Sequence, residues 1–317
     1  PKVTQIYSIS LLIGMIFPFL ILLFLDLIND KIQSRIDLEK LTDIEMIGII
    51  GRNHSAKSLL TDLNPKSSIA EGFRALRSNL GYKNTEGKDK VYLLTSSVSG
   101  EGKTFCSINL ASVFALSQRK TVLVGLDLRK PKIFGDFDLP NVNGVVNYLI
   151  GDSTLEEIIQ PTKIPHLDVI LAGAVPPNPS ELLMSSQMDV LMEALKKEYD
   201  YIILDTPPVG LVSDALELDA YVDATLYVIR QHYTKKGMLR LINDKYKKKE
   251  ITNISFVLNY FSAKSKLGYG YGYGYEYGYG YGKYGEAYRH QQKAGVLTIL
   301  KRKAKKVARW INEQLEH

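Results

Sequence analysis

Residues 91–104 read VYLLTSSVSGEGKT: an apolar strand, a glycine-rich loop and the start of a helix. The loop fits the phosphate-loop (P-loop) pattern of nucleotide-binding proteins, except that Ser97 replaces its first glycine. Glycines let backbone N–H groups approach phosphate oxygens, a lysine reaches the β and γ phosphates, and a threonine hydroxyl binds Mg²⁺. A short GKT motif often occurs by chance, but the strand–loop–helix context favours a nucleotide site. We expect the phosphates to be surrounded by Ser99, Gly100, Glu101, Gly102, Lys103, Thr104 and Phe105.

Two more apolar segments end in acidic residues, namely 201–208 (YIILDTPP) and 122–131 (VLVGLDLRKP). Asp205 is expected to hold Mg²⁺ beside the loop, directly or through water. The alternative is an aspartate that caps the turn before two prolines. Asp127 would ligate the metal or accept a proton, and Arg129 would balance phosphate charge. Their side chains would point the same way if the strand continues to Arg129.

Apolar runs alternate with helical stretches from Val91 onward, which is typical of a mostly parallel, doubly wound α/β sheet. Ligands of such sheets bind at the carboxyl ends of the strands, so Arg230 and Asn259 are candidates for adenine contacts. The expected strands are 91–96, 121–126, 167–171, 201–205, 224–229 and 254–259. The expected helices are 104–118, 144–150, 153–160, 180–198, 213–221 and 235–249.

The N-terminal part, residues 1–30, predicts a transmembrane helix. Residues 6–25 carry no charge and would be about 30 Å long as a helix, the thickness of a bilayer's hydrocarbon core. A buried soluble helix is the alternative. Lys31, Arg35 and Lys40 follow this run, which favours a cytoplasmic C-terminal side. Because the chain starts at Pro1, we expect it to be a fragment of a longer protein.

Residues 31–90 are expected to be a polar connector that contains at least one helix. Its best helical segment, EGFRALRSNL, places Glu71, Arg74 and Arg77 on one face at three-residue spacing. Such a face is either an ordinary solvated surface or a self-association surface, and helical spacing alone does not decide between them.

A tyrosine-rich tail, residues 266–290, follows the expected α/β domain, residues 91–265. Glycine alternates with tyrosine there, which makes the backbone costly to order and predicts disorder. Adhesive and β-prone segments share this composition. A nucleotide site on the same chain instead favours an enzyme that phosphorylates its own tail. The candidate acceptors are Tyr269, Tyr271, Tyr273, Tyr275, Tyr277, Tyr279, Tyr281, Tyr284 and Tyr288.

Residues 291–317 form a basic end to the chain. The stretch 293–317 contains seven basic residues and two acidic ones, almost the whole net charge of +6. An amphipathic helix lying on an acidic membrane is one expectation, and a solvated helix end is the other. The chain has a single cysteine, Cys106, which excludes an internal disulfide and favours a reducing compartment.

Taken together, these motifs resemble the bacterial tyrosine kinases (BY-kinases) of capsule and exopolysaccharide export. Those kinases are the cytoplasmic domains of Wzc-like polysaccharide co-polymerases and are related to the MinD/ParA ATPases. SSVSGEGKT resembles the family's Walker A loop, GLDLRKP its second acidic strand and IILDTPP its Walker B strand. EGFRALRSNL resembles its oligomerisation helix, and PPNPSELL at 176–183 is another phrase of the family.

The resemblance implies ATP and Mg²⁺ as cofactors and autophosphorylation in trans within a homo-oligomeric ring held by Glu71, Arg74 and Arg77. It implies catalytic roles for Lys103, Asp127, Asp205 and Arg129, with Thr104, Asp127 and Asp205 around the metal. The implied location is the bacterial inner membrane, with the kinase domain in the cytoplasm. The implied partners are a tyrosine phosphatase, the polysaccharide polymerase and export machinery, and membrane lipid. No nucleic-acid partner is expected.

This chain departs from the family at two positions of the site. Gly125 replaces the first aspartate of the second acidic strand, so Asp127 would carry that role alone. Ser99 replaces a usual proline. Two alternatives therefore stay open: a MinD/ParA-like assembly ATPase, and a chain-length regulator whose kinase activity is silenced.

Overall fold

The computed structural model describes residues 3–53, 59, 67–83, 90–131, 133–209 and 218–262. Two compact units divide the chain, Pro1–Ala263 and Lys264–His317, and every described residue belongs to the first. The predicted tyrosine-rich tail and the predicted basic segment 291–317 lie outside the described residues, and so do all nine candidate acceptor tyrosines.

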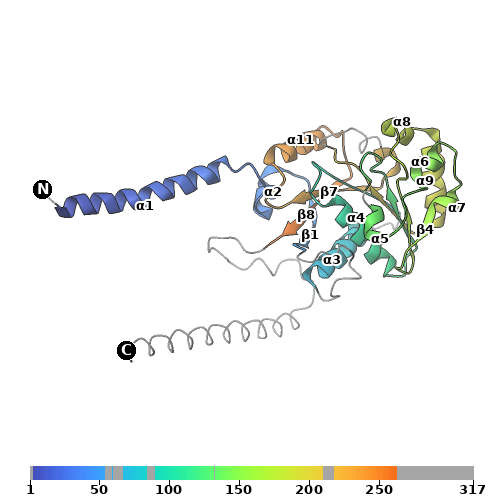
Figure 1. Cartoon of the computed structure of the whole chain (residues 1–317), viewed down its shortest axis with the longest axis horizontal. Coiled ribbons are helices and arrows are strands. Elements are labelled where there is room, and N and C mark those ends of the chain that lie inside the picture. The colour runs from blue at the N-terminus through green and yellow to red at the C-terminus, as the bar shows by residue number, and fades with distance from the viewer. Residues whose placement is uncertain are drawn as a thin grey trace, which may run out of the picture. The chain divides into compact units, whose positions relative to one another are not determined.

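An eight-stranded sheet forms the centre of the domain, in the order β1-β8-β7-β2-β6-β3-β5-β4 (Figure 1). Its neighbouring strands are parallel, except that β4 pairs antiparallel with β5. The mostly parallel α/β fold is therefore confirmed. The strands are β1 Met46–Gly51, β2 Val91–Ser96, β3 Thr121–Gly125, β4 Ile159–Pro161, β5 Leu167–Ile170, β6 Tyr201–Asp205, β7 Ala224–Arg230 and β8 Ile254–Phe261.

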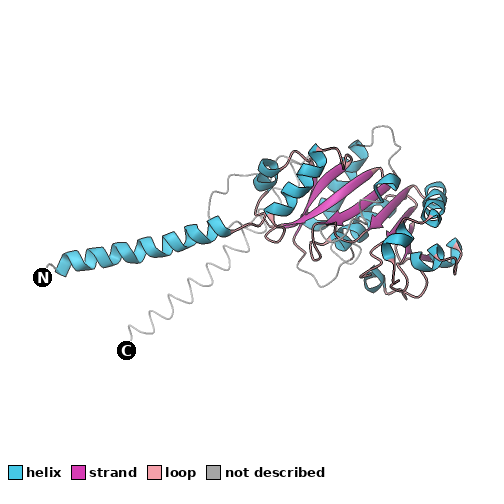
Figure 2. Ribbon diagram, turned by 90° about the horizontal axis from the view of Figure 1, so that it is seen from above, coloured by secondary structure: helices cyan, strands magenta, loops and turns pink. Residues whose placement is uncertain are grey.

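Helices cover both faces of this sheet (Figure 2). Alternate residues of β2 show the two layers, because Tyr92 and Leu94 join a core with α3 and α4, whereas Val91 and Leu93 join one with α6 and α9. Such burial on both faces explains why the strands are continuously apolar. The helices are α1 Val3–Ile28, α2 Arg35–Leu41, α3 Ser68–Lys83, α4 Lys103–Ala115, α5 Ile133–Phe137, α6 Val145–Leu149, α7 Leu155–Ile158, α8 Pro179–Leu183, α9 Ser186–Glu198 and α11 Lys236–Lys247, with a 3₁₀ turn at Leu218–Tyr221.

All six predicted strands are present, with ends shifted by two residues at most. The predicted helix 180–198 is instead two helices, because α8 ends at Leu183 and Ser185 occupies the N-cap position of α9. The predicted helix 153–160 is shortened to α7, since Ile159 and Gln160 pair with β5 at the sheet edge. Of the predicted helix 213–221, only the final 3₁₀ turn lies among the described residues.

The predicted connector contributes a strand and a helix to the domain. β1 pairs in parallel with β8, and α3 buries Phe73, Leu76 and Leu80 against the core. Gly48 permits this close packing, because a Cβ there would lie 2.8 Å from Leu76 Cδ1. β1 and α3 thus belong to the same sheet and compact unit as the strands that follow residue 91.

The predicted transmembrane segment is helical, as α1 covers Val3–Ile28 with Pro18 inside it. Within the described part of the chain, however, no helix combines the length and the apolar character that crossing a bilayer requires. The transmembrane prediction is thus not confirmed.

Candidate active site

The P-loop connects the end of β2 at Ser96 with the first residue of α4, Lys103. Gly100 and Gly102 have φ angles of 92° and 93°, in the left-handed region that glycine adopts without strain. The loop therefore leads directly into a helix N-terminus, where unpaired amides and the helix dipole favour an anion.

Asp205, at the end of β6, accepts hydrogen bonds from two side chains of α4. Thr104 Oγ1 donates to its Oδ2 at 2.9 Å, and Ser107 Oγ donates to its Oδ1 at 3.0 Å. Burial raises the pKa of Asp205, while Lys103 and the two hydroxyls act in the opposite direction. Sequence reasoning missed Ser107, although its position one turn after Lys103 places it on the same helix face.

Lys103 is the cation shared by the two predicted acidic residues. Its Nζ lies 3.0 Å from Asp127 Oδ2 and 3.8 Å from Asp205 Oδ1. The Lys103 and Asp127 side chains are only 10% and 13% exposed. Asp127 Oδ1 also accepts from the Lys130 backbone amide at 3.1 Å. The lysine thus balances two carboxylates that would otherwise repel each other in a nearly buried site.

The residues present fit a Mg²⁺–nucleotide complex. Thr104, Asp127 and Asp205 supply hard oxygen donors next to the P-loop, and Mg²⁺ in nucleotide sites is held by one or two carboxylates together with phosphates and water. Across the described residues, no group of three or more His, Cys, Asp or Glu side chains could hold a metal without such help. The predicted metal ligands therefore come together, but as a partial set that a phosphate would complete.

The condition for Arg129 and Asp127 to point the same way is not met, because β3 ends at Gly125 and strand alternation does not reach them. Arg129 Nη2 instead donates to Ser180 Oγ in α8 at 2.9 Å. The PPNPSELL phrase thus contacts the loop after β3.

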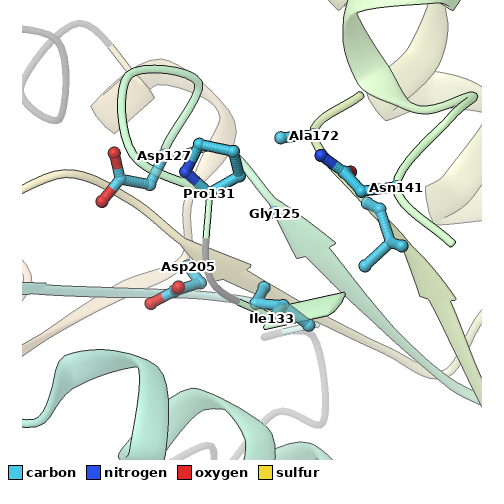
Figure 3. Close-up of a pocket in the computed structure, with 8 residues that line it drawn as sticks. Gly125, Asp127, Pro131, Ile133, Asn141, Ala172 and Asp205 are labelled. Carbon is cyan, nitrogen blue, oxygen red and sulfur yellow. The ribbon is translucent and has the colours of Figure 1, made fainter. Parts of the chain in front are cut away.

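A small pocket opens beside the two aspartates at the end of β3 (Figure 3). Gly125 lies in its floor, opposite Asp205 in the sheet register. A Cβ at Gly125 would lie 3.3 Å from Ile133 Cδ1 and 3.4 Å from the Ala172 nitrogen, so any side chain there must displace a neighbour slightly. The lining residues are Gly125, Asp127, Pro131, Ile133, Asn141, Leu171, Ala172 and Asp205.

Arg230 and Asn259, the predicted adenine contacts, hydrogen-bond to the P-loop backbone. Arg230 Nη1 donates to the Gly100 carbonyl at 2.7 Å, and Asn259 Nδ2 donates to the Glu101 carbonyl at 2.9 Å. Tyr233, which sequence reasoning missed, donates its hydroxyl to the Ser99 carbonyl at 3.0 Å.

Glu101 and Phe105, two predicted phosphate-site residues, direct their side chains elsewhere. The buried Glu101 carboxylate accepts from Thr234 Oγ1 and from the Val98 amide. Burial raises the pKa of Glu101, and these hydrogen bonds oppose the shift. The Phe105 ring packs edge-on against Phe73 of α3 with 5.7 Å between ring centroids. Only their backbones are available to a phosphate.

Comparison with known proteins identifies the family. A model described as an AAA domain matches residues 90–257, more than half of the chain. A putative tyrosine-protein kinase, CapB of Staphylococcus aureus, is 39% identical over 176 residues, which cover 56% of this chain and 77% of that protein. The chain belongs to the bacterial tyrosine-protein kinase family.

Two further members of this kinase family extend the match. Tyrosine-protein kinase ptk of Acinetobacter johnsonii is 29% identical over 281 residues, which are 85% of this chain but 38% of that longer protein. The kinase domain of the Escherichia coli tyrosine kinase ETK is 31% identical and superposes with a TM-score of 0.68, covering 76% of this chain and 100% of that one.

The three predicted oligomerisation residues of this family member have different contacts. Glu71 and Arg74 form an exposed ion pair within α3, with 2.5 Å between Glu71 Oε1 and Arg74 Nη1. Arg77 Nη1 donates to the Val113 carbonyl of α4 at 2.7 Å. Arg77 thus has a role inside the domain, whatever its part in assembly.

Proposed function

We propose that the chain is an ATP-dependent protein-tyrosine kinase that phosphorylates its own tyrosine cluster, 269–288. One observation carries the proposal: Lys103, Thr104, Asp127 and Asp205 converge beside a P-loop in a member of the tyrosine kinase family. The nine tyrosines give such a site an acceptor on the same chain.

Each residue of the candidate site would have a separate role in the reaction. The P-loop amides and Lys103 would bind the triphosphate, for which Lys103 must leave Asp127. Thr104, Asp127 and Asp205 would hold Mg²⁺, which would neutralise charge on the transferred phosphoryl group. Asp127 would then orient the acceptor hydroxyl and take its proton. Most of the rate would come from positioning and charge neutralisation.

Phosphorylation in trans would couple this chemistry to assembly. In the proposed ring, each tail enters the neighbouring subunit's site. Residues 268–290 have two acidic and two basic side chains, so their formal charge is zero. Each phosphate adds about −1.5 to −2, and even three would make docked tails repel one another. A tyrosine phosphatase would remove the phosphates, so that the tails could dock and the ring could assemble again.

The cellular setting of the proposal is polysaccharide export at the bacterial inner membrane. The relatives' names link them to tyrosine phosphorylation, and one match is described as a kinase of a cps region. We place α1 in the membrane because large side chains such as Leu11, Phe17 and Phe24 are more than half exposed. The cycle of ring assembly would regulate chain length together with the polymerase and export machinery, and 291–317 would contact lipid.

The test is incubation of the full chain with Mg·ATP, followed by intact mass and phosphotyrosine mapping. We expect a ladder of phosphates within 269–288, and none for Lys103→Met. For transfer in trans, Lys103→Met protein serves as acceptor and a variant with all nine tyrosines changed to phenylalanine serves as donor. Phosphate on the Lys103→Met chain supports transfer between subunits.

Two outcomes would contradict the proposal. ATP hydrolysis without phosphotyrosine would favour the assembly ATPase, and ATP binding without either reaction would favour a silenced regulator. The coupling to assembly fails separately if fully phosphorylated and unphosphorylated proteins sediment as the same oligomer.

A further inference from the structure

Three consecutive carbonyl groups of the P-loop are each held by a different side chain from the β7–β8 side of the site. The Ser99 carbonyl accepts from Tyr233 at 3.0 Å, and the Gly100 carbonyl accepts from Arg230 at 2.7 Å. The Glu101 carbonyl accepts from Asn259 at 2.9 Å. Arg230 is the last residue of β7, Tyr233 follows that strand, and Asn259 lies in β8. One side of the sheet thus holds the loop at three successive peptide units.

Holding these carbonyls also fixes the direction of three N–H groups. In a trans peptide the carbonyl of one residue and the N–H of the next point in opposite directions, and the described backbone has no cis peptide. The amides of Gly100, Glu101 and Gly102 must therefore point away from Tyr233, Arg230 and Asn259. No described residue accepts a hydrogen bond from these three amides. Successive N–H groups on one side of a loop form an anion-binding concavity.

The loop backbone would not hold this arrangement by itself. Glycine adopts both signs of φ at little cost, so the peptide units beside Gly100 and Gly102 are free to rotate unless something holds them. Gly102 is also the residue that lets Asn259 approach, because a Cβ there would lie 2.2 Å from Asn259 Nδ2. The glycines therefore allow the side chains to approach the backbone, and the hydrogen bonds from those side chains orient the peptide units.

The holding side chains are themselves fixed. The Arg230 guanidinium carbon lies 5.0 Å and 4.3 Å from the ring centroids of Tyr233 and Tyr260. Thr234 follows Tyr233 and donates to the buried Glu101 carboxylate, which also accepts from the Val98 amide. The segment 230–234 thus contacts the P-loop in two ways: Arg230 and Tyr233 hold its carbonyl groups, and Thr234 holds the side chain of Glu101.

We propose that Tyr233, Arg230 and Asn259 are positioning residues that orient the amides of Gly100, Glu101 and Gly102 toward the triphosphate before the nucleotide binds. The inference rests on the proposed nucleotide-dependent function. It differs from the adenine-contact role expected for Arg230 and Asn259, because a phosphate-orienting role does not depend on the base.

Binding of inorganic tripolyphosphate tests this difference, since it has no base. Calorimetry on the full chain would compare tripolyphosphate and Mg·ATP for wild type, Tyr233→Phe and Arg230→Met. Tyr233→Phe removes one donor and keeps the ring, whereas Arg230→Met removes the whole guanidinium with its charge and keeps the aliphatic stem. We expect both ligands to bind Tyr233→Phe roughly three- to tenfold more weakly, the effect of one lost hydrogen bond, and Arg230→Met at least that weakly. Tyr221→Phe is the matched control, because its hydroxyl donates to Asp189 instead.

Backbone ¹⁵N relaxation of the nucleotide-free protein gives a second readout that is independent of ligand. We expect lower order parameters for the Gly100, Glu101 and Gly102 amides in Tyr233→Phe than in Tyr221→Phe, at an unchanged melting temperature. Weaker ATP binding with unchanged tripolyphosphate binding would overturn the inference in favour of base contacts. Unchanged affinity for both ligands would also overturn it. If the wild type binds neither ligand, it is the proposed function that fails.

Discussion

The Lys103 ammonium nitrogen lies 3.0 Å from an Asp127 carboxylate oxygen, and both side chains are nearly buried. This pair joins the residue expected to bind phosphate to the residue expected to bind metal and accept a proton. In the proposed reaction, ATP would therefore exchange one anionic partner of Lys103 for another. This exchange would free Asp127 when the triphosphate arrives, so substrate binding itself would prepare the proposed catalytic carboxylate.

Asp127→Asn separates these two roles. The amide keeps a polar side chain of the same size but cannot take the proton, so we expect phosphoryl transfer to fall roughly 10²–10⁴-fold. Binding of ATP without Mg²⁺ should not weaken, because Lys103 loses a competing anion. Single-turnover assays and calorimetry measure the two quantities. An unchanged transfer rate would exclude Asp127 as the base.

Asp205→Asn is expected to stabilise the metal-free protein at neutral pH. Burial raises the pKa of Asp205 above the value of about 3.9 in an unfolded chain. Between those two pKa values the folded protein keeps a proton that the unfolded chain has lost, so stability falls as pH rises through this window. Asparagine does not titrate, so the Asp205→Asn variant avoids this fall in stability, which is about 1 kcal/mol for each unit by which the pKa is raised.

Urea unfolding of wild type and Asp205→Asn at pH 7 and below pH 4, without Mg²⁺, measures this effect. The difference should appear at pH 7 and shrink in acid. Added Mg·ATP should stabilise the wild type only, since the variant loses a metal ligand. A variant that is less stable than wild type at pH 7 would contradict the prediction.

Gly125→Asp tests what the missing carboxylate does. A third carboxylate beside Asp127 and Asp205 should destabilise the metal-free protein by about 1 to 4 kcal/mol through like-charge repulsion. Gly125→Ala is the control, because it brings the same Cβ against Ile133 without the charge. Melting temperatures with and without Mg²⁺ should show the metal closing the gap between the two variants. A gap that Mg²⁺ leaves unchanged would mean that the new carboxylate does not face the metal site.

Substitutions of Arg74 and Arg77, two arginines of α3, test whether this helix takes part in assembly of the oligomer. Arg77→Ala removes the hydrogen bond to the Val113 carbonyl and should cost about 1 kcal/mol of folding stability. Arg74→Ala removes an exposed ion pair and should cost less than about 0.5 kcal/mol. Urea unfolding gives both values, and sedimentation gives the oligomer. Loss of the oligomer in Arg74→Ala at full stability would mark α3 as an interface. An oligomer unaffected by Arg74→Ala would remove that residue from the proposed ring contact.

The sequence predicted those parts of the fold and site that are local. The strand before the P-loop, Lys103, Thr104 and the acid at the end of β6 follow from runs of fewer than ten residues. Asp205 and Thr104 lie together because parallel strands end at one edge. β1 was missed because its glycines weaken the strand pattern of a short segment, and its assignment depends on β8 far along the chain.

The parts that escaped prediction depend on contacts between distant residues. Tyr233 and Thr234 contact a P-loop that precedes them by 134 and 133 residues. Neither residue belongs to a motif, and a tyrosine or threonine after a strand has many ordinary roles. Arg230 and Asn259 were placed at the right edge of the sheet from strand ends alone, but their hydrogen-bond partners were not evident.

The order of the strands along the chain also bears on biosynthesis. The P-loop is complete by residue 104, whereas the residues that hold its carbonyls extend to Asn259 in β8. β8 is also the strand on which β1 pairs. A growing polypeptide therefore emerges from the ribosome with its P-loop made but its peptide planes still free to turn. If the positioning role proposed above holds, ATP binding would require β8 to be translated, so incomplete chains would not bind ATP.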